Sequence, residues 1–408
     1  MKRYLAVTLG ILTAVGGFVD AGDLVTNAVA GSRFGLSLVW VVVVGVVAIT
    51  LYAHMAGKVM ALSGRATFEV IRERLGARAA FANLAATMLM TLLTLTAEIG
   101  GMALALQLMT GAPPAVWIGL AAAAVWLVLW SVKFSIMETV AGLLGLTLIV
   151  FVVAFVALEP GWSTVARQVT AQDAPFGSLS YWYFVVALFG AAMTPYEVFF
   201  FSSGAAEEHW GPRDLMLSRL NSGVGFPLGG LLSVGIAGCA ALVFRPAGKT
   251  VETMGDVVHP VSIALGTAGL AIVLLGILAA TAGAALETAL SCGYGLAQYA
   301  GWPWGKRLRP VAAPQFHVTM LASIALAVAI LATGVDPIKV TEVSVVFSAV
   351  GLPLTYAPVL IVANDPQYVG ERVNGHVMNG LAMVLLVFIV VAAVAAIPLT
   401  ILTGMGSS

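Results

Sequence analysis

The sequence predicts an all-α integral membrane protein, and three observations support this fold class. Hydrophobic residues make up 60% of the 408 residues and charged residues only 9%, whereas soluble domains carry about 25% charged residues. Long apolar segments recur along the whole chain. Two of these segments contain glycine or proline beside acidic residues, which indicates helices that are interrupted inside the membrane.

Eleven segments are long and apolar enough to span a membrane, which takes about 20 mainly apolar residues per helix. The eighth could hold two helices, so twelve spans is the alternative count. The first follows Lys2 and Arg3 directly, but its two acids, Asp20 and Asp23, argue against a cleaved signal peptide. The segments are residues 4–30, 36–57, 82–109, 114–132, 139–158, 181–206, 219–244, 260–299, 315–334, 340–363 and 377–403.

The basic residues predict how these spans are oriented. With eleven spans and an inside N-terminus, the outside loops hold Arg33, Arg167, Arg245, Lys249 and Lys339, which leaves 14 of the 19 Lys and Arg residues inside. Cytoplasmic loops are the richer in Lys and Arg. We therefore expect a multi-pass protein of the cell's inner (plasma) membrane, with a cytoplasmic N-terminus and an outside C-terminus.

Several classes of function find no support in the sequence. The net charge is zero, which gives no argument for nucleic acid. No nucleophile–base set or cofactor motif is visible, so neither an enzyme nor a bound cofactor is expected. No soluble domain and no obligate protein partner are evident. The expected partners are the lipid bilayer and a transported solute.

Five acidic residues lie well inside the predicted spans, where each charge costs several kcal/mol. No Lys or Arg lies deep in any span, so a passing cation is one source of the missing positive charge. The alternative is that the acids are neutral and hydrogen-bonded to helix backbone, which Glu287 alone would favour. The five are Asp20, Asp23, Glu98, Glu197 and Glu287.

Two of the spans contain a predicted break beside such acids. In the first span, glycines flank Asp20 in the run GGFVDAGD of residues 16–23, and glycine weakens a helix by about 1 kcal/mol relative to alanine. In the sixth span, Pro195 removes a backbone donor and would free carbonyls near Ala191. Paired interruptions in corresponding helices indicate the binding site of an inverted-repeat transporter.

The chain resembles the NRAMP family of divalent metal transporters. Residues 20–23 read DAGD where the family has DPGN, and residues 194–196 read TPY where it has MPH. Closer matches are SGR at 63–65, FE at 68–69 and RER at 72–74, then AE at 97–98, ND at 364–365 and VN at 373–374. In its altered motifs the chain is similar to the NRAMP-related magnesium transporters, which also lack the methionine.

The resemblance implies a LeuT-type fold in which helices one and six are broken. It would form a single transmembrane transporter domain over residues 1–408. Two inverted five-helix repeats would cover about 4–158 and 181–363, and an eleventh helix would follow at about 377–403.

The resemblance also implies a metal site, carried over residue by residue. Its metal ligands would be Asp20, Asp23, the Ala191 carbonyl and Thr194, with Glu197 adding an oxygen directly or through water. Possible accessory residues are Glu98, Tyr196 and Ser344. Because Thr194 replaces the family's methionine, every ligand is oxygen, which suits Mg²⁺ or Mn²⁺. Met193 is adjacent, and an unwound segment that turned its sulfur inward is the alternative.

The residues that implement proton coupling in the family are also replaced. Leu95 stands where the family has an aspartate and Tyr196 where it has a histidine. We therefore expect a divalent cation transporter that works by alternating access and is weakly proton-coupled or uncoupled. A transporter of an organic amine or amino acid on the same fold is the alternative. Two aspartates at one break argue against binding a substrate carboxylate there.

Overall fold

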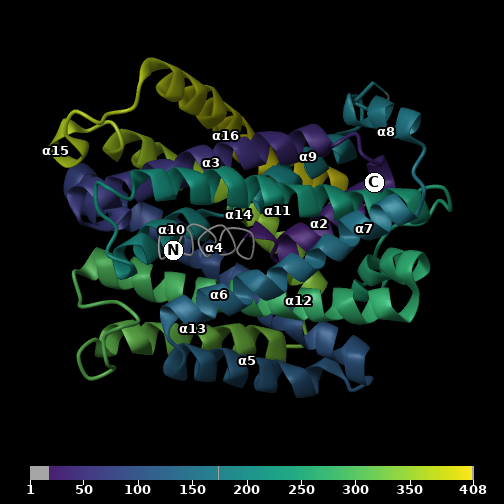
Figure 1. Ribbon diagram of the computed structural model, residues 1–408, viewed down its shortest axis with the longest axis horizontal. Coiled ribbons are helices and arrows are strands. Elements are labelled where there is room, and N and C mark those ends of the chain that lie inside the picture. The colour runs from purple at the N-terminus through teal and green to yellow at the C-terminus, as the bar shows by residue number, and fades with distance from the viewer. Residues whose placement is uncertain (1–17, 173, 407–408) are drawn as a thin grey trace.

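The computed structural model describes residues 18–406 except residue 173, and every element in that part of the chain is a helix (Figure 1). The predicted fold class is confirmed. The helices are α2 (Ala21–Phe34), α3 (Val39–Ser63), α4 (Thr67–Thr110), α5 (Pro114–Ser131), α6 (Phe134–Gly145), η1 (Leu146–Leu148), α7 (Ile149–Ala157), α8 (Trp162–Val169), α9 (Leu179–Ala192), α10 (Pro195–Glu207), α11 (Leu215–Val243), α12 (Met254–Ala300), α13 (Pro314–Ala332), α14 (Pro337–Val362), α15 (Pro366–Val369) and α16 (His376–Thr403).

Ten helical segments among the described residues are long and apolar enough to cross a membrane, and they match the second to eleventh predicted spans. The first predicted span, 4–30, is described only from Phe18 onward, so its first half lies outside the described residues. The long α12 is kinked at Gly266, where φ is 63°. Because residues 254–265 are too few to cross a bilayer, α12 counts as one span among the described residues.

The broken helices lie at the centre of the bundle. The most apolar stretch of the span formed by α9 and α10 is 94% buried, whereas that of α16 is only 28% buried. In Figure 1, α2, α10 and α14 lie in the middle, with α5 and α13 along one edge and α16 along the other. The peripheral helices expose large apolar side chains, such as Leu127 on α5 and Val394 on α16. These faces suit contact with lipid, since membrane helices need no polar surface there.

Residues 58–80, which lie between the second and third predicted spans, are mostly helical and contain several of the family-like motifs. Arg65 forms ion pairs with Glu69 (3.8 Å) and Glu73 within the first motif. Arg74 pairs with Asp365, which follows α14. The Gln367 backbone N–H and the Arg74 guanidinium hold the pKa of Asp365 below its usual value. These contacts fasten the start of α4 to the connection between α14 and α16.

Lys58 is a basic residue inside a span, although it lies near the end of that span and not deep within it. Helix α3 continues beyond the predicted end at residue 57, and Lys58 is buried inside it. Its ammonium donates to the carbonyls of Ala363 (3.2 Å) and Arg372 (3.1 Å) and to the Asn374 side chain. The cation is satisfied by carbonyl oxygens near the end of the bundle, so it does not neutralise any of the five acids.

Two glycines allow α14 to approach both broken helices. A Cβ atom on Gly190 of α9 would lie 2.4 Å from the Val345 carbonyl oxygen. A Cβ atom on Gly22 of α2 would lie 2.9 Å from Val345 Cγ1. Real Cβ atoms do not come this close, so only glycine permits the observed packing. Val345 therefore fixes the position of α2 relative to α9.

We predict that Gly190→Ala destabilises the protein, because the new methyl group collides with backbone that cannot move aside cheaply. Overpacking of this kind costs about 1–3 kcal/mol. Gly119→Ala on α5 is the matched control, since nothing lies within 4 Å of its Cβ position, and it should keep or slightly raise stability. Thermal unfolding in detergent measures both, and a Gly190→Ala midpoint at or above that of Gly119→Ala would contradict the packing argument.

Candidate functional site

The break in the first span is described from Phe18 onward. Val19 and Asp20 are non-helical, and α2 starts at Ala21. Asp20 is the N-cap of α2, and its carboxylate accepts the Asp23 N–H at 2.8 Å. Asp23 and Gly22 therefore lie in the first helical turn of α2, although the glycines of residues 16–23 had indicated a break there. A short capped break suffices because aspartate is a strong N-cap.

Glu98 holds this break in place from α4. Both of its carboxylate oxygens accept the Ala21 N–H, at 3.0 and 3.2 Å. Three carboxylates, those of Asp20, Asp23 and Glu98, thus gather at the N-terminus of α2. A helix N-terminus carries partial positive charge and stabilises negative groups. This arrangement explains how buried acids are tolerated here without a basic side chain.

The break in the sixth span follows the prediction. Helix α9 ends at Ala192, Met193 and Thr194 have non-helical backbone angles, and α10 starts at Pro195. Pro195 is the first residue of α10, a position that suits proline because no N–H is needed there. For the same reason it offers no donor to the Ala191 carbonyl four residues earlier. The Thr194 hydroxyl donates to Glu197 at 3.2 Å, and both side chains are buried.

The two breaks meet through Tyr196 and Asp20. The Tyr196 hydroxyl forms a hydrogen bond with the Asp20 carboxylate, which links the first turn of α10 to the N-cap of α2. Glu197 interacts electrostatically with Asp20 and Asp23. Residues predicted at both breaks are therefore brought together at the centre of the bundle.

Asp23 and Ser344 have further partners that the sequence did not indicate. Asp23 accepts from Asn27 at 2.8 Å and from the Ser233 hydroxyl of α11, so its carboxylate faces α11 as well as the breaks. Ser344 shares a hydrogen bond of 3.0 Å with Thr94 and joins α14 to α4. No three Asp, Glu, His or Cys side chains among the described residues converge on one metal-sized point. A cation here would need carbonyl, hydroxyl or water oxygens to complete its shell.

Glu287 belongs with this group although the candidate ligands did not include it. It is buried on α12 and interacts electrostatically with Asp20, Glu197 and Glu98. The sequence did mark Glu287 as unusual, because it is a carboxylate in the middle of a span. Its neighbours come from three other helices, so no local spacing joined it to them.

Met193 is fully buried within the main apolar core. Its side chain packs among hydrophobic residues.

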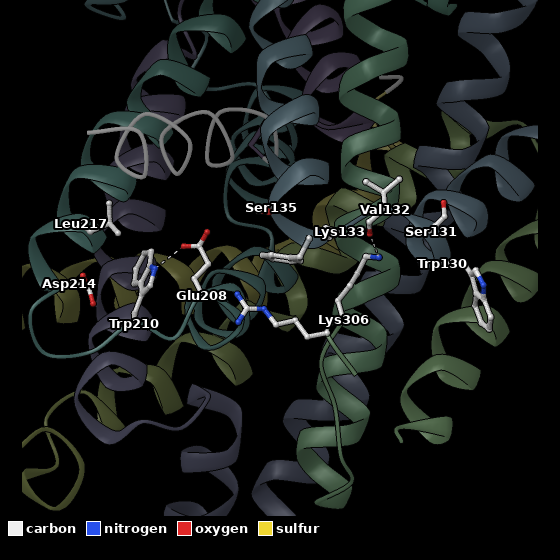
Figure 2. A pocket seen from close by; sticks show the side chains of 12 residues that line it. Trp130, Ser131, Val132, Lys133, Ser135, Glu208, Trp210, Asp214, Leu217 and Lys306 are labelled. Atoms are coloured by element: carbon white, nitrogen blue, oxygen red, sulfur yellow. Dashed lines mark hydrogen bonds between the residues drawn. The ribbon is translucent and has the colours of Figure 1, made fainter. Parts of the chain in front are cut away.

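A large cavity lies elsewhere, at one end of the bundle (Figure 2). It has a volume of about 810 Å³ and lies between the ends of α5 and α10 and the connection that follows α12. Lys306 reaches across it to the carbonyls of Leu129 and Val132, and Trp210 donates to Glu208 at 2.8 Å. None of the five buried acids lines this cavity, so its size does not identify the site of the breaks.

We predict that Glu98→Ala destabilises the protein by about 1–3 kcal/mol, because it leaves the buried Ala21 N–H without an acceptor. Glu98→Gln keeps an amide oxygen that can accept the same hydrogen bond, and should retain most of the stability. Thermal unfolding midpoints of the two variants test this role. Equal losses in both would show that negative charge, and not the acceptor, is what α2 requires.

The sequence matches the profile of the Nramp family, described as natural resistance-associated macrophage protein-like, over residues 10–398. A divalent metal cation transporter MntH of Mycobacterium tuberculosis is 26% identical over 396 residues, which cover 94% of this chain and 89% of that protein. The MntH of Aeromonas hydrophila is 24% identical over 388 residues, which cover 92% of this chain and 91% of that protein.

Solved structures with the same fold include transporters of different families. A mutant of the Eremococcus coleocola manganese transporter gives a TM-score of 0.75 at 18% identity, covering 95% of this chain and 85% of that one. Mhp1, a nucleobase-cation-symport-1 family transporter, gives 0.60 at 14% identity, covering 96% and 92%. The likeness supports the expected LeuT-type fold with helices one and six broken. Since the family profile spans nearly the whole sequence, this chain belongs to the Nramp family of membrane transporters.

Proposed function

We propose that this chain carries a divalent metal cation across the membrane by alternating access, and that Mg²⁺ or Mn²⁺ is its preferred cargo. The observation that carries the proposal is the meeting of two helix breaks at buried carboxylates that have no basic partner. None of the ion pairs among the described residues involves the five buried acids. A dication between the breaks would supply the positive charge that these acids lack.

The proposed ligands are oxygen atoms from both breaks. Asp20 and Asp23 provide carboxylates from α2, and the Ala191 carbonyl and Thr194 hydroxyl provide neutral oxygens from the α9–α10 break. Glu197 binds directly or through a water molecule. Since Asp23 also accepts from Ser233 and Asn27, its remaining lone pairs would face the ion. Glu287 is a further candidate that would interact through water.

The all-oxygen ligand set favours a hard ion. Carboxylate, carbonyl and water ligands suit Mg²⁺, Ca²⁺ and Mn²⁺, while sulfur favours softer metals. Mg²⁺ keeps several waters and takes one or two carboxylates, which fits a site where no three acids converge. The names of the relatives, a divalent metal cation transporter and a manganese transporter, support the same class of cargo.

Proton coupling is proposed to be weak or absent. Leu95 and Tyr196 occupy positions where the resemblance expects an aspartate and a histidine, and a free tyrosine titrates near pH 10 whereas histidine titrates near 6.5. Tyr196 is also held by its hydrogen bond with Asp20. Glu98 accepts a hydrogen bond from the Ala21 N–H, which supports a role in positioning the start of α2.

The organic amine or amino acid alternative is less well supported. A substrate carboxylate would meet the negative charges of Asp20 and Asp23, and the family profile points to metal ions. We further propose that the chain lies in the plasma membrane with its N-terminus inside and its C-terminus outside, as the Lys and Arg distribution favours. Inverted repeats over about 4–158 and 181–363, with an extra helix at about 377–403, are part of the same proposal.

We predict that Thr194→Met increases the transport of Cd²⁺ or Fe²⁺ relative to Mg²⁺, because it adds a soft thioether to the ligand set. Asp20→Ala should abolish or strongly reduce flux of every metal. The measurement is uptake by proteoliposomes of Mg²⁺, Mn²⁺, Ca²⁺, Fe²⁺, Zn²⁺ and Cd²⁺. Thr139→Met on α6, which forms neither break, is the matched control and should leave selectivity unchanged. Unaltered selectivity in Thr194→Met would contradict the proposed hard-ion site.

A second prediction concerns protons. Liposomes loaded with a pH-sensitive dye should show metal entry without stoichiometric acidification of the lumen. The reason is that the chain lacks the histidine and the aspartate that the resemblance assigns to proton coupling. One proton or more entering with each metal ion would overturn the uncoupled mechanism while leaving the metal site intact.

A further inference from the structure

A second cavity, of about 430 Å³, lies at the end of the bundle where α3 ends and α11 begins. The connection between α14 and α16 closes its other side. Its polar lining consists of His54, Lys58, Arg219, Arg372 and Asn374, and the remaining lining residues are apolar or glycine. Every charged side chain in this lining is a cation. Such a pocket attracts a negatively charged ligand.

Asn374 adds a buried donor that has no acceptor. Lys58 donates to its side-chain oxygen, and since an ammonium group only donates, the amide orientation is fixed. The Nδ2 group is then the free end of the side chain, and it is buried without a hydrogen-bond partner. Only 7% of Asn374 is exposed. A buried donor in this state needs an acceptor to offset its loss of water.

The N-termini of two helices line the same pocket. Helix α16 starts after Gly375, which lines the cavity and provides no side-chain cap. The first turn of α11 lines it through Leu215 and Met216 and also lacks a side-chain cap. The N-cap residue of α11 is an acid, Asp214, but its carboxylate accepts from the Gly211 N–H and lines the neighbouring 810 Å³ cavity. Helix N-termini favour bound anions, and that of α16 has no acidic cap.

We propose that this pocket binds a phosphate-type oxyanion. The exposed guanidinium groups of Arg219 and Arg372 suit phosphate oxygens, which they can bind in pairs. The Asn374 Nδ2 group and the backbone N–H groups in the first turn of α16 would donate hydrogen bonds to the oxyanion from the buried side of the pocket. Either the phosphodiester of an anionic phospholipid or free inorganic phosphate supplies this chemistry. The apolar rim and the position at the end of membrane helices favour the lipid.

Bound phosphate would connect three parts of the fold. Arg219 belongs to α11, Arg372 and Asn374 to the connection before α16, and Lys58 to α3. The ligand would therefore draw α11 towards the connection that Lys58 already anchors. Stabilisation of the folded protein by the ligand follows by mass action.

The test measures thermal unfolding of the full chain in detergent, with no metal present. Added phosphatidylglycerol should raise the midpoint by several degrees over phosphatidylcholine, and inorganic phosphate is compared with chloride at equal ionic strength. A shift with phosphatidylglycerol alone identifies the lipid as the source, and a shift with inorganic phosphate identifies the free ion. No shift with either would overturn the proposal.

Two variants locate the effect. Asn374→Asp keeps the side-chain shape and the contact with Lys58 but turns the free donor into a carboxylate oxygen, so the shift should disappear. The exposed pair Arg219→Gln and Arg372→Gln should also remove it, and provides the test if Asn374→Asp does not fold. Arg78→Gln, an exposed arginine on α4 outside the pocket, should keep the shift. Native mass spectrometry of bound lipid gives a second readout, and adducts retained in both pocket variants would overturn the assignment.

Discussion

The cost of burying carboxylates that lack basic partners is the constraint on which the centre of this protein depends. Five acids from four helices interact there, and none forms an ion pair with a described Lys or Arg. Four of them, all except Glu287, are held by donors: backbone N–H groups at the start of α2, the hydroxyls of Ser233 and Thr194, and the phenol of Tyr196. These donors stabilise negative charge without cancelling it, which leaves room for a dication to bind.

The breaks themselves are positioned by neighbouring helices more than by their own sequence. Val345 of α14 packs into the space left by Gly22 and Gly190, and Glu98 of α4 holds the first turn of α2. Helix α4 and helix α14 in turn share the bond between Thr94 and Ser344. A movement of α4 or α14 would therefore displace both breaks together, which is a physical route by which alternating access could change the exposure of one site.

Much of the fold could be predicted from the sequence because membrane helices are encoded locally. Ten of the eleven predicted spans have a described helical counterpart, and Pro195 marks the break in the sixth span by chemistry alone. What failed depended on contacts between distant segments. The burial of Lys58 follows from carbonyls and Asn374 more than 300 residues away. Ser233, which donates to Asp23, and the acids that interact with Glu287 lie on other helices. The glycines around Asp20 did not show that Asp23 lies in the first turn of α2, because glycine content does not reveal which backbone donors a cap will find.

The central claim is that a dication binds between the two breaks, and locating Mn²⁺ in the protein tests it most directly. Crystals grown with Mn²⁺ and measured near its absorption edge give an anomalous difference map that shows the ion alone. The account predicts one strong peak bounded by Asp20 and Asp23 on one side and by Ala191 and Thr194 on the other. A peak held by other residues, with these oxygens left unoccupied at saturating Mn²⁺, would contradict it.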